Sequence, residues 1–557
     1  MNNIQHIIKE RRLYNNKLHG NSNSKFNFSP IYLKDEYNKF AEKLSKLWLI
    51  CNNKNNIKHC SNKLIIYYNE FSEYKRNNFE NENNELRKKR IDFYNLKKID
   101  NHCHLSAVMT TNELKQYMID HNQDPQSSIT IYKMNSIIDE KNVIHRKKCN
   151  CYDKYNFNDF NNKYYIGKHG VTDNPNNLRQ CLLKINSGKD KLERINTSVP
   201  KYNLHNLGKF NCSKPHYANI CKKVCNIRNK NNTHLDLRIS LYGKSKNELE
   251  TLAKWFTNNK LYNITNVDWY IQIPRIPHLI HRNNFSINSP NDYFSSFVEW
   301  FDNIFVPIKE AYNKNNSQLL LFLNKVFGFD SVDNEEEYND EYYKNVGTII
   351  DNKYIKKQLK NKKNPFNYSM YLYLMWYYIS DLNKTVKNKR KIFFFKPHSG
   401  ELGYAHHLLT SFILCDSICH GINLISDTVS KYDNNLEILK KNKNNVLLYL
   451  YCKDKVGCAL SPISNSYLSR NYRCLHLDLL FNVGLNMSIN TDDPLMFHLT
   501  NDPLMEEYTM IKTIYNLSLI DLVELINNSI TINGNYKKQI QLKKREQKRL
   551  MLMNVYK

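Results

Sequence analysis

Short apolar runs that end in a chemically active residue are the feature that most limits what this chain can fold into. From about residue 96, runs of strand length alternate with longer stretches of helical character. The runs are Leu96–Asp100, Leu235–Leu241, Trp269–Ile273, Ile392–Lys396, Val446–Tyr451, Ala459–Pro462 and Leu485–Asn490. This alternation predicts a parallel β/α protein, whose functional side chains gather at the C-terminal ends of strands. An open doubly wound sheet shares the pattern, but no glycine-rich phosphate loop supports that alternative.

The segments on either side of this pattern predict additions to one main domain. Residues 1–95 are highly charged and have helical periodicity, which indicates an N-terminal helical arm. Residues 96–535 would form the main domain, with polar insertions on loops near 186–232 and 313–363. Residues 536–557 are a basic tail, most simply one solvated face of a helix.

The net charge of +28 in 557 residues favours an anionic partner or reflects a lysine- and asparagine-rich composition. The even spacing of lysine and asparagine favours the second interpretation. A basic nucleic-acid-binding protein is a remote alternative, since no RRM, KH or zinc-finger pattern is present and we expect no nucleic-acid partner. No apolar run of about 18 residues predicts a membrane span. With 14 cysteines and no secretory signal, reduced thiols and a cytoplasmic location are expected.

A histidine pair follows the first apolar run. His102 and His104 stand one residue apart at the end of a predicted strand. In extended backbone, residues i and i+2 point to the same side, so both imidazoles can reach one cation. Neutral imidazole is a preferred ligand for zinc and related metals. A lone pair of this kind is more often structural than metal-binding.

A second strand end carries His398-Ser399-Gly400-Glu401. His398 is a third candidate ligand, and Gly400 lets the backbone turn sharply so that Glu401 returns over the site. A turn with a solvated glutamate is the simpler alternative for this segment.

The last predicted strand runs into Asp492-Asp493-Pro494. One aspartate can bind the metal while its neighbour faces the pocket, although the same triplet also suits the start of a helix. His420, which precedes a glycine, is unremarkable when taken alone.

The order of these motifs is more specific than any one of them. HxH, then HxGE, then HG about two dozen residues later, then DDP resembles the purine deaminases among the amidohydrolase barrels. Longer segments resemble the AMP deaminase family in particular. They are Lys98–His104, Leu237–Ser245, Trp269–Arg275, Asn364–Phe366 with the tyrosines after it, Thr491–His498 and Pro503–Tyr508. The resemblance implies an α/β protein with a (β/α)8 TIM-type barrel that converts AMP to IMP and ammonia.

The resemblance also implies a role for each matching residue. The ligands of one zinc ion per subunit would be His102, His104, His398 and Asp492. His420 would take the proton from the metal-bound water, Glu401 would hydrogen-bond purine N1, and Asp493 would orient the attacking hydroxide. The residues that would contact the substrate are His104, Lys154, Asn156, Phe160, Asn161, Lys163, Tyr164, Glu401, Asp493, Pro494, Leu495 and Met496.

The segment that would bind the 5′-phosphate departs from the family pattern. Residues 152–156 match its front half and residues 160–164 its back half, which indicates a duplication or small insertion. Cys151 replaces an expected arginine, and Lys154 and Lys163 remain as the cations for the phosphate.

Three related questions stay open at this point. An adenosine deaminase or N6-modified AMP deaminase would share the metal motifs, and Met496 replaces a glutamine that would bind the substrate. A non-catalytic relative would not need all seven chemistry-bearing positions, which are present. The resemblance further implies a homo-oligomer, a tetramer or a dimer, and possible nucleotide effectors.

Overall fold

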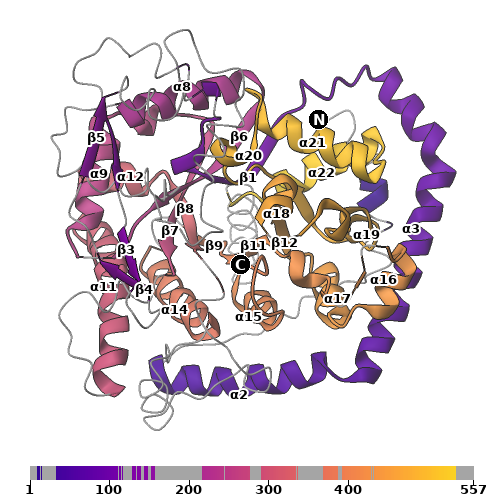
Figure 1. The fold of residues 1–557 in the computed structure, drawn as a ribbon, viewed down its shortest axis with the longest axis horizontal. Helices are drawn as coiled ribbons and strands as arrows, with labels where there is room; N and C mark the ends of the chain where they lie inside the picture. The colour runs from indigo at the N-terminus through magenta and orange to yellow at the C-terminus, as the bar shows by residue number, and fades with distance from the viewer. Residues whose placement is uncertain are drawn as a thin grey trace, which may run out of the picture.

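A ring of parallel strands surrounded by helices occupies the centre of the computed structural model (Figure 1). Five strands pair in the order β1-β6-β7-β8-β9. They span Lys98–His104, Thr233–Ser240, Val267–Pro274, Val326–Val332 and Phe394–Phe395. The strands β10-β11-β12-β13 follow, at His398–Ser399, Ser417–His420, Gly457–Leu460 and Met487–Ile489. The residues that the structure describes are 9–12, 14, 33–110, 112–113, 116, 128–132, 135–138, 144–147, 152–156, 216–243, 245–275, 290–333, 335, 368–386, 392–427, 429–430, 432–468 and 470–534.

Backbone hydrogen bonds join the two groups of strands at both ends. β9 and β10 lie on one extended stretch interrupted at Pro397, which has no N–H to donate to a sheet. The Pro397 carbonyl still accepts from the Cys419 amide at 2.9 Å. On the other side, the Asp492 amide donates to the His102 carbonyl at 2.8 Å, and the Asp492 carbonyl accepts from the His104 amide at 2.9 Å. The predicted parallel α/β barrel is therefore confirmed, with β1 beside the segment that follows β13.

The strands are apolar because both of their faces are covered. β1 and β7 are buried along their whole length, and β6 nearly so. Continuous apolar runs are typical of such parallel strands. Among the described residues after 215, the α-helices are α8 (His216–Lys230), α9 (Glu248–Asn258), α11 (Pro290–Asn313), α12 (Ser317–Leu323), α14 (Tyr368–Val386), α15 (His406–Leu414), α16 (Asn435–Lys441), α17 (Asn445–Asp454), α18 (Pro462–Leu468), α19 (Leu477–Asn482), α20 (Pro494–Phe497), α21 (Pro503–Tyr515) and α22 (Leu519–Ile532). Within the described residues, no helix combines the length and apolarity that crossing a membrane requires.

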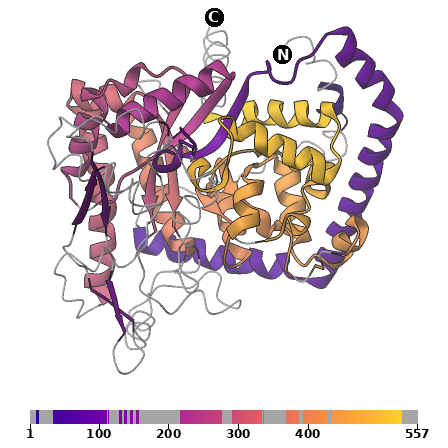
Figure 2. The same cartoon turned by 45° about the horizontal axis from the view of Figure 1, so that its top comes forward.

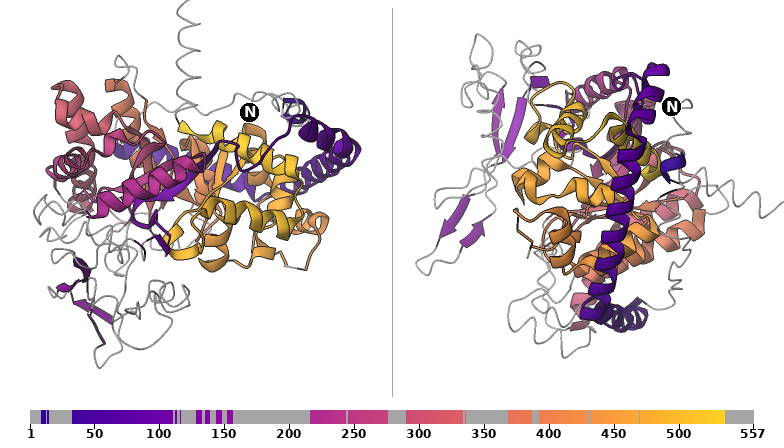
Figure 3. Two further views of the ribbon diagram at one scale, coloured as in Figure 1. Left: turned by 90° about the horizontal axis from the view of Figure 1, so that it is seen from above. Right: turned by 90° about the vertical axis from the view of Figure 1, so that its right-hand side faces the viewer.

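Two antiparallel pairs lie to one side of the ring (Figure 3). β2 (Ser128–Tyr132) pairs with β5 (Tyr152–Asn156), and β3 (Asn135–Ile138) pairs with β4 (Ile144–Lys147).

Three expectations about local structure are wrong. The run Val446–Tyr451 lies in helix α17 rather than in a strand. A short apolar run has the same composition in a buried helix and in a buried strand, so periodicity does not separate them. The segment 186–232 contains helix α8, and 313–363 contains α12 and the ring strand β8. The exposed residues of α8 include Lys223, Asn226, Asn229 and Lys230, which are part of the polar composition that suggested a loop. Residues 186–215, 336–363 and the basic tail lie outside the described residues.

Most of the described N-terminal part of the chain is helical. Helices α2 (Leu33–Cys51) and α3 (Lys54–Lys88) follow the outside of the ring along two of its sides (Figures 1 and 2). On α3, Leu64 and Phe71 are fully buried, so this helix packs against the barrel through an apolar stripe.

A buried arginine ties this outer layer to the barrel. The Arg11 guanidinium donates to both carboxylate oxygens of Glu82 on α3, at 2.7 and 2.8 Å. It also donates to Asp521 at 2.9 Å and to Glu524 at 2.8 Å, both on α22. Arg11 thus joins the first described residues to the last described helix.

Candidate metal centre and active site

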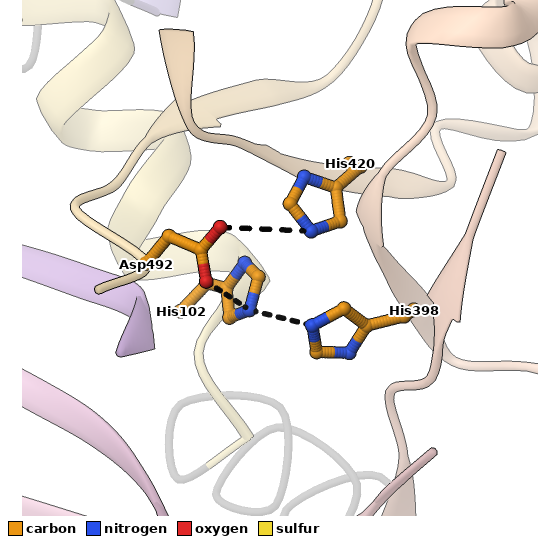
Figure 4. A group of neighbouring side chains, drawn as sticks. All are labelled: His102, His398, His420 and Asp492. Atoms are coloured by element: carbon orange, nitrogen blue, oxygen red, sulfur yellow. Dashed lines mark hydrogen bonds and ion pairs between the residues drawn. The ribbon is translucent and has the colours of Figure 1, made fainter. Parts of the chain in front are cut away.

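Several imidazoles and a carboxylate meet at the C-terminal ends of the strands, and Figure 4 draws four of these side chains, His102, His398, His420 and Asp492. His102 and His104 end β1, His398 begins β10, and Asp492 follows β13. His420, at the end of β11, lies beside them. All five side chains are buried. The ring therefore brings together residues from opposite ends of the chain.

Four of the separations between these ligand atoms suit a single cation, and a ring nitrogen of His420 also lies within 4.8 Å of ligand atoms of His102, His398 and Asp492. His102 Nε2 lies 3.2 Å from His104 Nε2 and 3.1 Å from His398 Nε2. Asp492 Oδ1 lies 3.2 Å from His104 Nε2 and 3.5 Å from His102 Nε2. Four ligands held tetrahedrally by zinc stand about 3.3 Å apart, given the usual zinc–nitrogen distance.

The tautomers of two histidines also fit a cation. The Nδ1 atom of His398 lies 2.9 Å from Oδ1 of Asp330, and that of His104 lies 2.6 Å from Oε1 of Gln272. Because both partners are acceptors, each Nδ1 donates, and each Nε2 presents a lone pair to the centre. Converging lone pairs in a buried site repel one another unless a cation lies between them. The donor set therefore fits a zinc-class metal.

Partners outside the ligand set fix the ligands in place. Besides Asp330 and Gln272, the hydroxyl of Ser464 donates to Asp492 Oδ2 at 2.7 Å. Such contacts orient metal ligands and set their basicity. Sequence reasoning assigned no role to these three residues. The feature of the sequence that could have indicated Gln272 and Asp330 is that each is a polar residue within an apolar strand.

Burial and charge set the protonation of the cluster. Burial lowers the pKa of His398 to about 4 and holds that of His102 well below its ordinary value, which favours the neutral ligand form. Burial opposes ionisation of Asp492, but the histidines around it, His102 foremost, outweigh burial and depress its pKa. Burial raises the pKa of Glu401 to about 7.

The backbone is held in unusual conformations at this site. His420 and Asp492 have φ values of 68° and 60°, in the left-handed region that residues other than glycine rarely adopt. Gly400 has φ 70°, and a Cβ there would lie 2.5 Å from Leu408 Cδ2. The turn expected at Gly400 is present, and it brings Glu401 toward the cluster.

Glu401 and His420 form a second group beside the ligands. Glu401 Oε2 lies 3.5 Å from His420 Nε2, which is 4.0 Å from Asp492 Oδ2. The side-chain nitrogen of Asn465 lies 3.0 Å from His420 Nδ1 and 3.3 Å from Glu401 Oε1. Asn465 is another residue that sequence reasoning missed.

A buried carboxylate holds the turn that carries Glu401. Glu335 is 2% exposed, and its Oε2 accepts from the Gly400 amide at 3.1 Å. The same oxygen lies 3.3 Å from His407 Nδ1. Glu335 belongs to an acidic run to which sequence reasoning gave no chemistry, yet it contacts the site's own backbone.

The residues expected to contact the substrate are only partly described. Asp493 lies at the N-terminus of α20, and an oxygen of its carboxylate is within 4.8 Å of ligand atoms of His104 and Asp492. The next three residues are buried in α20: Pro494, Leu495 and Met496. Lys154 and Asn156 lie in β5, where only the backbone is described. The expected contacts outside the described residues are Phe160, Asn161, Lys163 and Tyr164.

Comparison with known proteins places the chain in a family. A family model described as AMP deaminase matches residues 12–545. The AMP deaminase of Arabidopsis thaliana is 32% identical over 448 residues, which cover 80% of this chain and 47% of that protein. AMP deaminase 1 of Rattus norvegicus is 30% identical over 454 residues, covering 79% and 53%. The chain thus spans about half the length of the curated relatives it matches.

A solved structure of adenine deaminase from Arthrobacter aurescens aligns with 80% of this chain and 97% of its own, at a TM-score of 0.39 and 12% identity. The fold is established here by strand order alone, and family membership by sequence. The match over residues 12–545 includes every strand of the ring and each of the converging side chains. The chain belongs to the AMP deaminase family.

Proposed function

We propose that the protein hydrolyses AMP to IMP and ammonia. The observation that carries this proposal is the convergence of His102, His104, His398 and Asp492 next to His420, within a chain of the AMP deaminase family. Relatives at about 30% identity bear the name AMP deaminase. An adenosine or N6-modified AMP deaminase is the alternative that the same site would serve.

Four side chains would hold one zinc ion. His104 is a better fourth ligand than His420, because its Nε2 lies 3.2 Å from both His102 Nε2 and Asp492 Oδ1. His420 Nε2 lies farther from Asp492, at 4.0 Å. When bound, such a cation supplies a nucleophile at neutral pH by acidifying a water molecule.

The remaining groups would move protons and orient the reactants. His420 faces the ligand cluster with Nε2, where it would take up the proton released as water attacks purine C6. Glu401 would donate a proton to purine N1, which gains charge as the ring loses aromaticity. Asp493 would orient the attacking oxygen. Positioned acid–base groups of this kind contribute on the order of 10²–10⁴-fold to rate.

Selectivity for a nucleotide would come from cations that meet the 5′-phosphate. Lys154 and Lys163 are the residues we assign to this role. The substrate would also contact Pro494, Leu495 and Met496. We further propose that residues 1–95 act as an arm around a catalytic barrel at 96–535, and that the protein works in the cytoplasm as a homo-oligomer that responds to nucleotides.

One assay separates these possibilities. The purified protein is incubated with AMP, adenosine or dAMP, and ammonia release is followed before and after treatment with a zinc chelator. We expect release from AMP above that from adenosine, loss of activity with chelator, and recovery on adding Zn²⁺. Preference for adenosine would favour the alternative, and activity that persists in the metal-free protein would overturn the metal assignment.

A further inference from the structure

The start of helix α18 presents two consecutive polar side chains to the site. Ser464 and Asn465 lie in the first turn of α18, just after β12, and both are fully buried. Ser464 bonds the ligand Asp492. Asn465 instead faces the two groups assigned to proton transfer, His420 and Glu401. Neighbouring residues thus serve the metal and the acid–base pair separately.

Two motif residues with no role so far hold this turn in place. Glu507 Oε2 accepts from the Ile463 amide at 3.1 Å, and its Oε1 lies 3.1 Å from His498 Nε2. Both His498 and Glu507 are completely buried. An otherwise orphaned amide at the helix start therefore gains a rigid acceptor, and Asn465 is presented from a fixed backbone.

An amide suits the position that Asn465 occupies. Its nitrogen can donate to His420 Nδ1 when that atom bears a lone pair, and its oxygen can accept when that atom bears a proton. Proton uptake at His420 Nε2 requires the ring to carry its other proton on Nδ1. A side chain with both a donor and an acceptor can hold the ring in either form, whereas a methyl group can hold it in neither.

We propose that Asn465 is a positioning residue that fixes His420 and Glu401 relative to each other, through an amide nitrogen that contacts both. This inference rests on the proposed deaminase function. Ser464 bonds the proposed metal ligand Asp492, whereas Asn465 contacts His420 and Glu401. We therefore expect the loss of the Asn465 amide to act on turnover, and the loss of the Ser464 hydroxyl to act on metal binding.

Three single variants test the proposal in the full chain: Asn465→Ala, Ser464→Ala and Ser466→Ala. Ser466 is the matched control, because it lies on the same helix and its hydroxyl donates to the Ile463 carbonyl, at 2.8 Å, rather than to a residue of the site. Zinc content, zinc affinity, and kcat and KM for AMP are measured for each at saturating Zn²⁺. We expect Asn465→Ala to lower kcat about 10–100-fold, the usual effect of removing such a partner, with KM and zinc content little changed. Ser464→Ala should instead weaken zinc binding about 10–100-fold and keep most of its kcat once saturated.

A further variant guards against misfolding of Asn465→Ala. Asn465→Asp keeps the shape but has no amide donor and sets a negative charge beside Glu401. We expect its pH–rate profile to shift relative to that of Ser466→Ala. The positioning role would be wrong if Asn465→Ala matched the Ser466→Ala control in kcat and in pH–rate profile. If Asn465→Ala does not fold, the same comparison is made with Asn465→Asp. Absence of AMP deamination in the unsubstituted protein would instead overturn the proposed function, and this inference with it.

Discussion

Replacing Gln272 by methionine tests how the barrel prepares its metal ligands. Gln272 is 1% exposed; its Oε1 lies 2.6 Å from His104 Nδ1, and its Nε2 donates to Ser240 Oγ at 2.6 Å. Methionine has a similar volume and length, so the packing around the site changes little. The substitution removes the acceptor that keeps the His104 proton on Nδ1.

The size of the effect follows from that single contact. A buried donor left without an acceptor costs about 1–3 kcal/mol. In the metal-free protein, His104 can escape this cost by moving its proton to Nε2 or by rotating. In the metal-bound protein it cannot, because Nε2 must present its lone pair. Most of the cost therefore falls on the bound state, which corresponds to a loss of about 10–100-fold in zinc affinity.

Competition with a chromophoric chelator at pH 7 measures this affinity. Ser240→Ala is the matched control, since it removes the far partner of Gln272 and leaves the contact with His104. We expect Ser240→Ala to bind zinc nearly as the native protein does, and Gln272→Glu, which retains an acceptor, to bind far better than Gln272→Met. Equal zinc affinity in Gln272→Met and Ser240→Ala would refute the argument that Gln272 sets the tautomer of His104.

Further substitutions test the catalytic, phosphate and acid-stability assignments. His420→Ala should keep zinc content near normal and lower turnover about 10²–10⁴-fold, measured as ammonia release; full activity would remove His420 from the mechanism. Lys163→Ala should raise KM for AMP far more than for adenosine, and equal changes would exclude a phosphate contact. The charges of Lys75 and Arg11 outweigh the burial of Asp521 and lower its pKa. The ionised Asp521 carboxylate therefore stabilises the fold above about pH 4, and this stabilisation is lost as the pH falls through the lowered pKa of the folded state. The free energy of unfolding, measured by urea titration, should therefore fall less in Lys75→Met than in the native protein as the pH is lowered from 5 to the acid end of the titration. An equal dependence on pH in the two proteins would contradict this.

Local sequence was sufficient to predict the three histidines that converge with Asp492. His102, His104 and His398 were placed by this rule, because the C-terminal ends of parallel strands face one edge of the barrel. The rule does not identify their partners. Which ligand meets Gln272 or Asp330 depends on how β6, β7 and β8 are staggered, and this stagger is set by packing across the whole ring.

The roles of two residues and the structure of one segment were not predicted, for local reasons. Ser464 and Asn465 follow a correctly predicted strand, but serine and asparagine at a strand end ordinarily mark a turn, so they were given no chemistry. Val446–Tyr451 has the composition of a buried strand, and only its packing in α17 shows that it is a helix. Sequence thus predicted the side chains that converge at the strand ends more reliably than the side chains that contact them.

The position of Arg11 has a consequence for how this protein is made. Its partner Asp521 lies 510 residues further along the chain. At about 5–20 residues per second, a ribosome needs roughly 25–100 s to synthesise the chain between them. During that time the arginine has emerged while its partners on α22 do not yet exist. The contact that ties the outer helices to α22 can therefore form only after residue 521 has been synthesised, and the part of α3 that packs on α22 stays uncovered until then.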